Sequence, residues 1–156
     1  VLKGHIAVVE TDLKKNSTGK KIDVNARKFL KRDGLDYAHG TGHGVGFFLN
    51  VHEGPQSISK NNSIKIEEGM ILSNEPGYYK KNHFGIRIEN LVYAKQTSNG
   101  LRFKNLTFAP MEKDLINFNL LNKSEKNYLF KYHSDIYTKY SKFLNKSERK
   151  WLASLI

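Results

Sequence analysis

Histidines and glycines gather in one short stretch of the sequence. Three of the six histidines, His39, His43 and His52, fall within fourteen residues, and four glycines alternate with other residues between positions 40 and 46. Imidazole is a common metal ligand and an acid or base near neutral pH. Alternating glycines let a backbone pass close to another segment, and they disfavour a helix. Each histidine alone is more often a surface or core residue, but the cluster indicates a functional site.

Two glutamates stand in unusual surroundings. Glu75 follows an apolar run and directly precedes Pro76-Gly77, whereas Glu89 lies inside an alternating apolar segment. A buried carboxylate is costly unless it is paired or binds a cation. One histidine and two glutamates would suit a divalent ion such as Mn²⁺, Co²⁺ or Zn²⁺. An ion pair between Glu89 and its same-face neighbour Arg87 explains Glu89 equally well, so both interpretations stay open here.

Several other kinds of active site are excluded. His52-Glu53 is followed by Gly-Pro-Gln, so the second histidine of a zinc-peptidase helix is missing. Position 45 is valine and no Gly-Lys-Ser/Thr follows, so neither phosphate-binding glycine pattern fits. Without cysteine the chain has no disulfide, thiolate zinc site or cysteine nucleophile.

The composition indicates about one domain with a strong positive charge. The 156 residues include 26 Lys or Arg and 15 Asp or Glu, for a net charge of +11. Because 21 of the basic residues are Lys and asparagine occurs fifteen times, the charge is typical of solvated surface positions. Phosphate and base recognition favours Arg, so we expect no nucleic-acid partner. No apolar run approaches the ~20 residues of a membrane helix, and we expect a cytoplasmic protein without membrane contact.

Hydrophobic periodicity predicts the elements that position these residues. The first dozen residues are ambiguous, because Ile6–Val9 suits a buried strand or part of a helix. A polar loop is expected over 14–21, followed by a helix over 22–32 with an i,i+4 pair of Asp23 and Arg27 and a stop at Gly34. Strands are predicted over 47–52, over 70–73 and, most clearly, as one strand over 85–94.

The last third of the chain has a helical pattern. The tetrapeptide Asn-Lys-Ser-Glu occurs at 122–125 and again at 145–148, each time suited to cap a helix. After the second copy come the apolar residues Trp151, Leu152 and Leu155. After the first comes an amphipathic stripe, which we expect to pack on the preceding segment or on a second subunit: Leu129, Tyr132, Ile136, Tyr140 and Phe143. The sequence thus predicts an α+β segment over 1–106 and a helical extension over 107–156.

Four ordered motifs resemble those of aminopeptidase P, the Xaa-Pro aminopeptidase of the creatinase-like pita-bread metallopeptidases. They are HGTGHGVG at 39–46, NVHEGP at 50–55, SNEPGYY at 73–79 and GIRIEN at 85–90. Their order and spacing match, and the opening residues are similar to a family helix. The resemblance covers almost the whole chain. It implies the C-terminal half of a pita-bread fold followed by a helical C-terminal extension.

The resemblance also implies a metal centre. His43, Glu75 and Glu89 match three of the family's five metal ligands, with Glu89 as a bridging carboxylate. The other two ligands are aspartates in an earlier half of the domain, and neither Asp12 nor Asp23 lies in a matching motif. The family pattern therefore implies two divalent ions, of the Mn²⁺ type, in the intact enzyme. It also implies that this chain, as the C-terminal half of a catalytic domain, is inactive alone.

Catalytic and substrate-binding roles follow from the same resemblance. His39 and His52 match histidines that contact the substrate and the developing oxyanion, and Arg87 matches a residue that holds metal-bound carboxylates. Glu75 is the implied proton acceptor and Tyr78 a further substrate contact. The implied enzyme is a homodimer that releases the N-terminal residue from peptides with proline in the second position. A prolidase that cleaves Xaa-Pro dipeptides, a non-catalytic pseudo-peptidase module and a gene remnant remain as alternatives.

Overall fold

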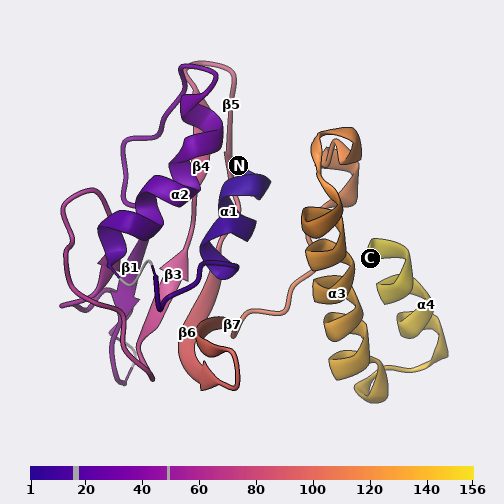
Figure 1. Ribbon diagram of the computed structural model, residues 1–156. Helices are drawn as coiled ribbons and strands as arrows, with labels where there is room; N and C mark the ends of the chain where they lie inside the picture. Colours follow the sequence, from indigo (N-terminus) through magenta and orange to yellow (C-terminus); the bar gives the residue numbers. More distant parts are fainter. Residues whose placement is uncertain (16–17, 49) are drawn as a thin grey trace. The chain divides into compact units, whose positions relative to one another are not determined.

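The computed structural model describes residues 1–15, 18–48 and 50–156. The chain forms two compact units, Val1–Thr107 and Phe108–Ile156 (Figure 1). The first unit combines helices with antiparallel strands, and the second is helical in its described elements. The predicted α+β class is therefore confirmed.

An antiparallel sheet of five strands, in the order β2-β1-β3-β6-β7, forms the centre of the first unit. Its strands are β1 (Gly42–Val45), β2 (Ser57–Ile58), β3 (Ile71–Asn74), β6 (Asn90–Thr97) and β7 (Gly100–Asn105). Strand β3 confirms the strand predicted over 70–73. Leu72 of β3 lies opposite Val92 of β6, and both side chains are fully buried. Burying such aliphatic side chains contributes about 1.5–3 kcal/mol each.

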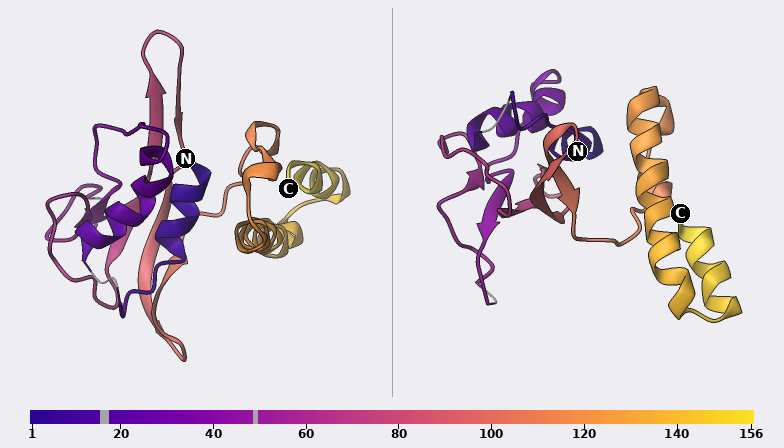
Figure 2. Two further views of the ribbon diagram at one scale, coloured as in Figure 1. Left: turned by 45° about the horizontal axis from the view of Figure 1, so that its top comes forward. Right: turned by 60° about the horizontal axis from the view of Figure 1, so that its bottom comes forward.

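Two helices cover one face of this sheet (Figures 1 and 2). They are α1 (Leu2–Val9), which settles the ambiguity of the opening segment, and α2 (Gly19–Lys31). Helix α2 begins inside the predicted loop over 14–21, so the start predicted at residue 22 was wrong. The amide of Lys20 donates to the carbonyl of Asn62 at 2.8 Å, a distant partner that the local polar pattern does not reveal.

The strand predicted over 47–52 is not formed by the described residues of that range, and Leu49 lies outside them. Strand β1 comes earlier, and the chain then reverses. The amide of Gly46 donates to the carbonyl of Asn50 at 2.8 Å, and the amide of Glu53 donates to the carbonyl of Gly44 at 2.9 Å. Phe47 and Phe48 are 90% and 83% exposed at this reversal. The described residues of this apolar alternation therefore belong to a loop.

The single strand predicted over 85–94 is two strands. Strand β5 (Phe84–Arg87) pairs with β4 (Gly77–Lys80) in a separate hairpin, whereas β6 pairs with β3 and β7. The chain changes partners at Ile88 and Glu89, where the amide of Ile88 donates to the carbonyl of Pro76 at 3.4 Å. The alternation continues through this break, so it does not record the change of partner strand.

The second unit contains α3 (Lys123–Tyr140) and α4 (Lys146–Leu155), with short 3-10 turns at Lys113–Leu115, Phe118–Leu120 and Ser141–Phe143. Both helices begin with a capping box, as predicted. The side chains of Asn122 and Glu125 exchange hydrogen bonds with each other's backbone amides, and Asn145 and Glu148 do the same.

The apolar stripe of α3 is buried only in part. Leu129, Tyr132 and Ile136 are buried, whereas Tyr140 and Phe143 are 42% and 74% exposed. Helix α3 ends at Tyr140, so Phe143 leaves its face. The surface that the exposed part of the stripe contacts stays a prediction. Across the described part of the chain, no helix has both the length and the apolar character that a bilayer span requires.

Candidate metal centre

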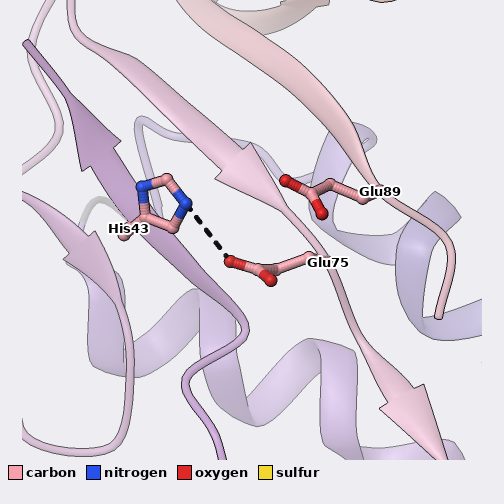
Figure 3. Close-up of side chains that lie close together, drawn as sticks. All are labelled: His43, Glu75 and Glu89. Atoms are coloured by element: carbon pink, nitrogen blue, oxygen red, sulfur yellow. Dashed lines mark ion pairs between the residues drawn. The ribbon is translucent and has the colours of Figure 1, made fainter. Parts of the chain in front are cut away.

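Three strand ends bring the predicted ligands together. His43 lies in β1, Glu75 directly follows β3, and Glu89 directly precedes β6. In the antiparallel β3–β6 pair Asn74 lies opposite Asn90. Glu75 follows Asn74 and Glu89 precedes Asn90, so these two glutamates face each other. Each of the three predicted ligands offers one donor atom, and these atoms lie within 4.8 Å of one another (Figure 3).

Glu75 has little access to solvent, and hydrogen bonds hold it from several sides. The residue is 9% exposed. Its Oε1 accepts a hydrogen bond from Ser73 Oγ at 2.9 Å, and its Oε2 accepts one from Arg87 Nη1 at 3.1 Å. Its backbone amide donates to the carbonyl of Thr41 at 2.8 Å. These bonds fix the carboxylate in one orientation before any ligand binds.

The hydrogen bonds of His43 leave one ring nitrogen free to bind a cation. Nδ1 lies 3.0 Å from the carbonyl oxygen of Gly44, and since a carbonyl only accepts, Nδ1 carries the proton. In the neutral ring Nε2 has a lone pair, and this atom lies 3.5 Å from Glu75 Oε1 (Figure 3). Metal-binding histidines characteristically donate their other N–H in this way. The donor set therefore fits a divalent cation.

Glycine is required beside His43 because neighbouring backbones approach closely. A Cβ atom on Gly42 would lie 1.9 Å from the carbonyl oxygen of Ser73, and one on Gly44 would lie 2.0 Å from that of Glu53. These contacts explain the alternating glycines that the sequence shows. They let β1 lie close enough to β3 for the backbone amide of His43 to bond Ser73 Oγ at 2.9 Å.

The two other predicted histidines take different places. The His52 ring centroid lies 4.0 Å from that of His43, so His52 borders the cluster from an exposed position. His39 is tied elsewhere: its Nδ1 lies 2.7 Å from the carbonyl of Gly40 and its Nε2 lies 2.8 Å from the hydroxyl of Tyr79. His39 thus reaches the cluster only through other side chains.

Tyr79 provides that connection, and sequence reasoning missed it. Arg87 Nε donates to the Tyr79 hydroxyl at 2.7 Å, and that hydroxyl shares a hydrogen bond of 2.8 Å with His39 Nε2. The hydrogen bond to Tyr79 raises the pKa of Arg87 above its ordinary value, and the charges of Glu75 and Glu89 act in the same direction. A chain of contacts therefore runs from His39 through Tyr79 and Arg87 to Glu75.

One sequence-based alternative is resolved by these contacts. Arg87 forms its ion pair with Glu75, at 3.1 Å, rather than with Glu89 as the simple strand model supposed. Tyr78 packs its ring edge-on against Phe84, with centroids 6.0 Å apart. Its contact with substrate stays a prediction.

The aspartates within the chain do not join the cluster. Asp23 forms an ion pair with Arg27 at 2.8 Å, and Asp12 forms one with Arg102 at 2.5 Å. Both were expected to lie outside the ligand set. Among the residues that the structure describes, the group of His43, Glu75 and Glu89 is the one set of three such donors that could hold a metal ion.

Comparison with known proteins defines the class. The model of metallopeptidase family M24 matches residues 1–96, and the model of the C-terminal region of peptidase M24 matches residues 99–155. The chain therefore belongs to metallopeptidase family M24. Its relatives of known structure are pita-bread peptidases, and the predicted fold class is confirmed.

Individual relatives are more specific. A peptidase of Schizosaccharomyces pombe is 48% identical, over 97% of this chain and 27% of that protein. A protein named probable Xaa-Pro aminopeptidase P from Laccaria bicolor is 46% identical, over 97% of this chain and 26% of its own length. The crystal structure of an X-prolyl aminopeptidase from Caenorhabditis elegans, described as a cytosolic enzyme with a di-nuclear active site, is 36% identical with a TM-score of 0.89. The match covers 99% of this chain and 27% of the Caenorhabditis elegans chain. The chain thus spans about a quarter of the length of such relatives.

Proposed function

We propose that this chain supplies the C-terminal part of the catalytic domain of a metal-dependent Xaa-Pro aminopeptidase. Such an enzyme releases the N-terminal residue from peptides that have proline in the second position. The observation that carries the proposal is the convergence of the His43, Glu75 and Glu89 donor atoms within 4.8 Å. The motif order of the sequence and the names of the relatives point in the same direction.

His43, Glu75 and Glu89 are the residues that would hold metal. We propose two divalent ions in the intact enzyme, of the Mn²⁺ type. Carboxylate oxygen and imidazole nitrogen are ligands that suit Mn²⁺. When bound, such ions supply an activated water near neutral pH and polarise the scissile carbonyl.

The surrounding side chains orient the reacting groups. Arg87 and Ser73 hold the two oxygens of Glu75, so that this carboxylate keeps the position from which it accepts a proton. We propose that His52, whose ring lies beside that of His43, donates a hydrogen bond to the developing oxyanion. The hydrogen bond with Tyr79 holds the ring of His39, which we propose contacts the substrate.

An aminopeptidase is favoured over a prolidase by the match along almost the whole chain. The Caenorhabditis elegans X-prolyl aminopeptidase covers 99% of this chain, whereas a prolidase from Pyrococcus furiosus, 34% identical with a TM-score of 0.62, covers 71%. Prolidase is the second candidate because its structure also covers most of this chain. We further propose a cytoplasmic homodimer, in line with the family resemblance.

Activity assays separate these candidates. With Mn²⁺ and with the upstream half of the catalytic domain present, we expect cleavage of Xaa-Pro-Xaa peptides to exceed that of Xaa-Pro dipeptides. The 156-residue chain alone should show no comparable rate, since a two-metal site needs more ligands than it offers. A preference for dipeptides would favour the prolidase, and strong cleavage by the chain alone would contradict the two-half site.

Matched variants test the ligand set. Glu75→Gln should abolish cleavage, because it removes the negative charge that binds metal and accepts the proton, while keeping the side-chain size. The exposed Glu67 provides a control, and Glu67→Gln should leave cleavage unchanged. Equal rates for Glu75→Gln and the original protein would refute the proposed centre.

A further inference from the structure

A buried ion-pair network joins α2 to the segment before β1. Arg27 and Asp23 have side chains only 3% and 1% exposed. Arg27 Nε donates to both carboxylate oxygens of Asp23, at 2.9 and 2.8 Å. Its Nη1 donates to Asp36 Oδ1 at 2.6 Å and to the carbonyl of Tyr37 at 2.7 Å. Its Nη2 donates to the carbonyl of His39 at 2.6 Å. One guanidinium thus binds a helix and the whole segment 36–39.

Asp23 extends this network towards the metal ligands. Its Oδ1 accepts a hydrogen bond from the fully buried Thr41 Oγ1 at 2.6 Å. The carbonyl of Thr41 in turn accepts the backbone amide of Glu75 at 2.8 Å. Two hydrogen bonds therefore connect the Asp23 carboxylate to the backbone of Glu75.

Ring contacts extend the same network from Arg27 to His39. The Arg27 guanidinium lies 3.9 Å from the centroid of the Tyr37 ring, and the His39 ring follows at 4.9 Å from Tyr37. Burial raises the pKa of the Tyr37 hydroxyl to about 12, so this ring stays neutral. The orientation of His39 is thereby fixed at its carbonyl, by Arg27, and at its ring, by Tyr37 and Tyr79.

We propose that Arg27, together with Asp23, is a positioning residue for the peptidase site. It holds His39 directly and Glu75 through Thr41, although its own side chain binds none of the metal donor atoms. The catalytic part of this inference rests on the proposed function. An arginine is needed because its planar fork reaches acceptors in several directions, whereas a lysine ammonium is a single point charge.

Arg27→Lys and Thr41→Val are the informative variants, because each removes network bonds and leaves no new buried charge unpaired. Arg27→Ala is unsuitable, since it would leave the buried Asp23 carboxylate without its ion-pair partner and strongly destabilise the fold. Arg32→Lys is the matched control: Arg32 is exposed and follows the same helix. Ile22→Ala provides a second control, because it destabilises α2 through the core alone.

Amide hydrogen exchange tests the network without any assay of activity. Arg27→Lys and Thr41→Val should speed exchange of the Glu75 amide about tenfold or more, because the Thr41 carbonyl loses its fixed position. The amide of Ala94, bonded to the carbonyl of Met70 within the unit, should be unaffected. An unchanged Glu75 amide, or equal acceleration at Ala94, would overturn the positioning role.

Kinetics of the complete enzyme test the catalytic consequence. Arg27→Lys should lower kcat for a Xaa-Pro-Xaa peptide about 10- to 100-fold with a smaller change in KM, as outer-shell losses do. Arg32→Lys should keep kcat. Ile22→Ala should also keep kcat, even where it lowers Tm as much as Arg27→Lys does. A loss of kcat no greater than that of Ile22→Ala would refute the proposal. If the unmodified enzyme cleaves no such peptide, the proposed function fails, and the exchange of the Glu75 amide still decides the positioning role.

Discussion

Protonation of His5 should make the stability of the first unit depend on pH. His5 lies in α1 with its side chain fully buried, and neither ring nitrogen has a hydrogen-bond partner within the described residues. Burial lowers the pKa of His5 from 6.5 to about 4, against a weaker opposing effect of the nearby backbone of Ile88 and Asn74. The His5 imidazole is therefore harder to protonate in the folded chain than in the unfolded chain.

The size of the effect follows from this pKa. Above pH 6.5 the imidazole is neutral in both states, and stability does not depend on it. As the pH falls from 6.5 towards about 4, only the unfolded state binds the proton, and the free energy of unfolding decreases by about 1.4 kcal/mol per pH unit. The total loss is on the order of 3 kcal/mol. Below a pH of about 4 both states are protonated and the loss stops growing.

Urea unfolding followed by circular dichroism, at a series of pH values and with a chelator present, measures this dependence. His5→Gln should remove the loss of about 3 kcal/mol between neutral pH and a pH of about 4, whatever its own effect at neutral pH. His83→Gln, at an exposed position, should keep the original slope. Fluorescence of Trp151, in the second unit, serves as an internal reference. If His5→Gln and the original chain lose stability in parallel, the reasoning is refuted.

Four further outcomes are expected. Glu89→Gln should weaken Mn²⁺ binding, measured by calorimetry, by at least about tenfold, and unchanged affinity would exclude Glu89 as a ligand. Leu72→Ala should lower the free energy of unfolding by about 2–5 kcal/mol in urea, because it leaves a cavity in a fully buried position. Asn145→Ala should cost about 1 kcal/mol in thermal unfolding of the second unit, through the lost cap of α4. Gly42→Ala should displace β1 and abolish Mn²⁺ binding, since its Cβ would lie 1.9 Å from a carbonyl oxygen; full binding would contradict the close strand packing.

Sequence reasoning succeeded where the determinants are local or where spacing constrains geometry. The two capping boxes were predicted because a cap needs only residues three positions apart. The motifs predicted that His43, Glu75 and Glu89 lie together, and the antiparallel register of β3 and β6 brings the two glutamates together. Their role as metal ligands stays a prediction. The alternating glycines correctly indicated a close backbone approach.

Tertiary structure alone decided which segments pair and what each polar group contacts. Alternating apolar residues look the same in the exposed residues 47, 48 and 50–52 as in a strand, and the alternation over 85–94 hides a change of partner strand. The Asp23–Arg27 pair was predicted as a helix neighbour, yet it is buried and binds the segment before β1. Likewise, Arg87 forms hydrogen bonds with Glu75 and Tyr79 rather than with Glu89, which is nearer to it in the sequence. Periodicity records which face a side chain occupies, but hydrogen-bond partners come from residues far apart in the chain, and only the folded arrangement determines them.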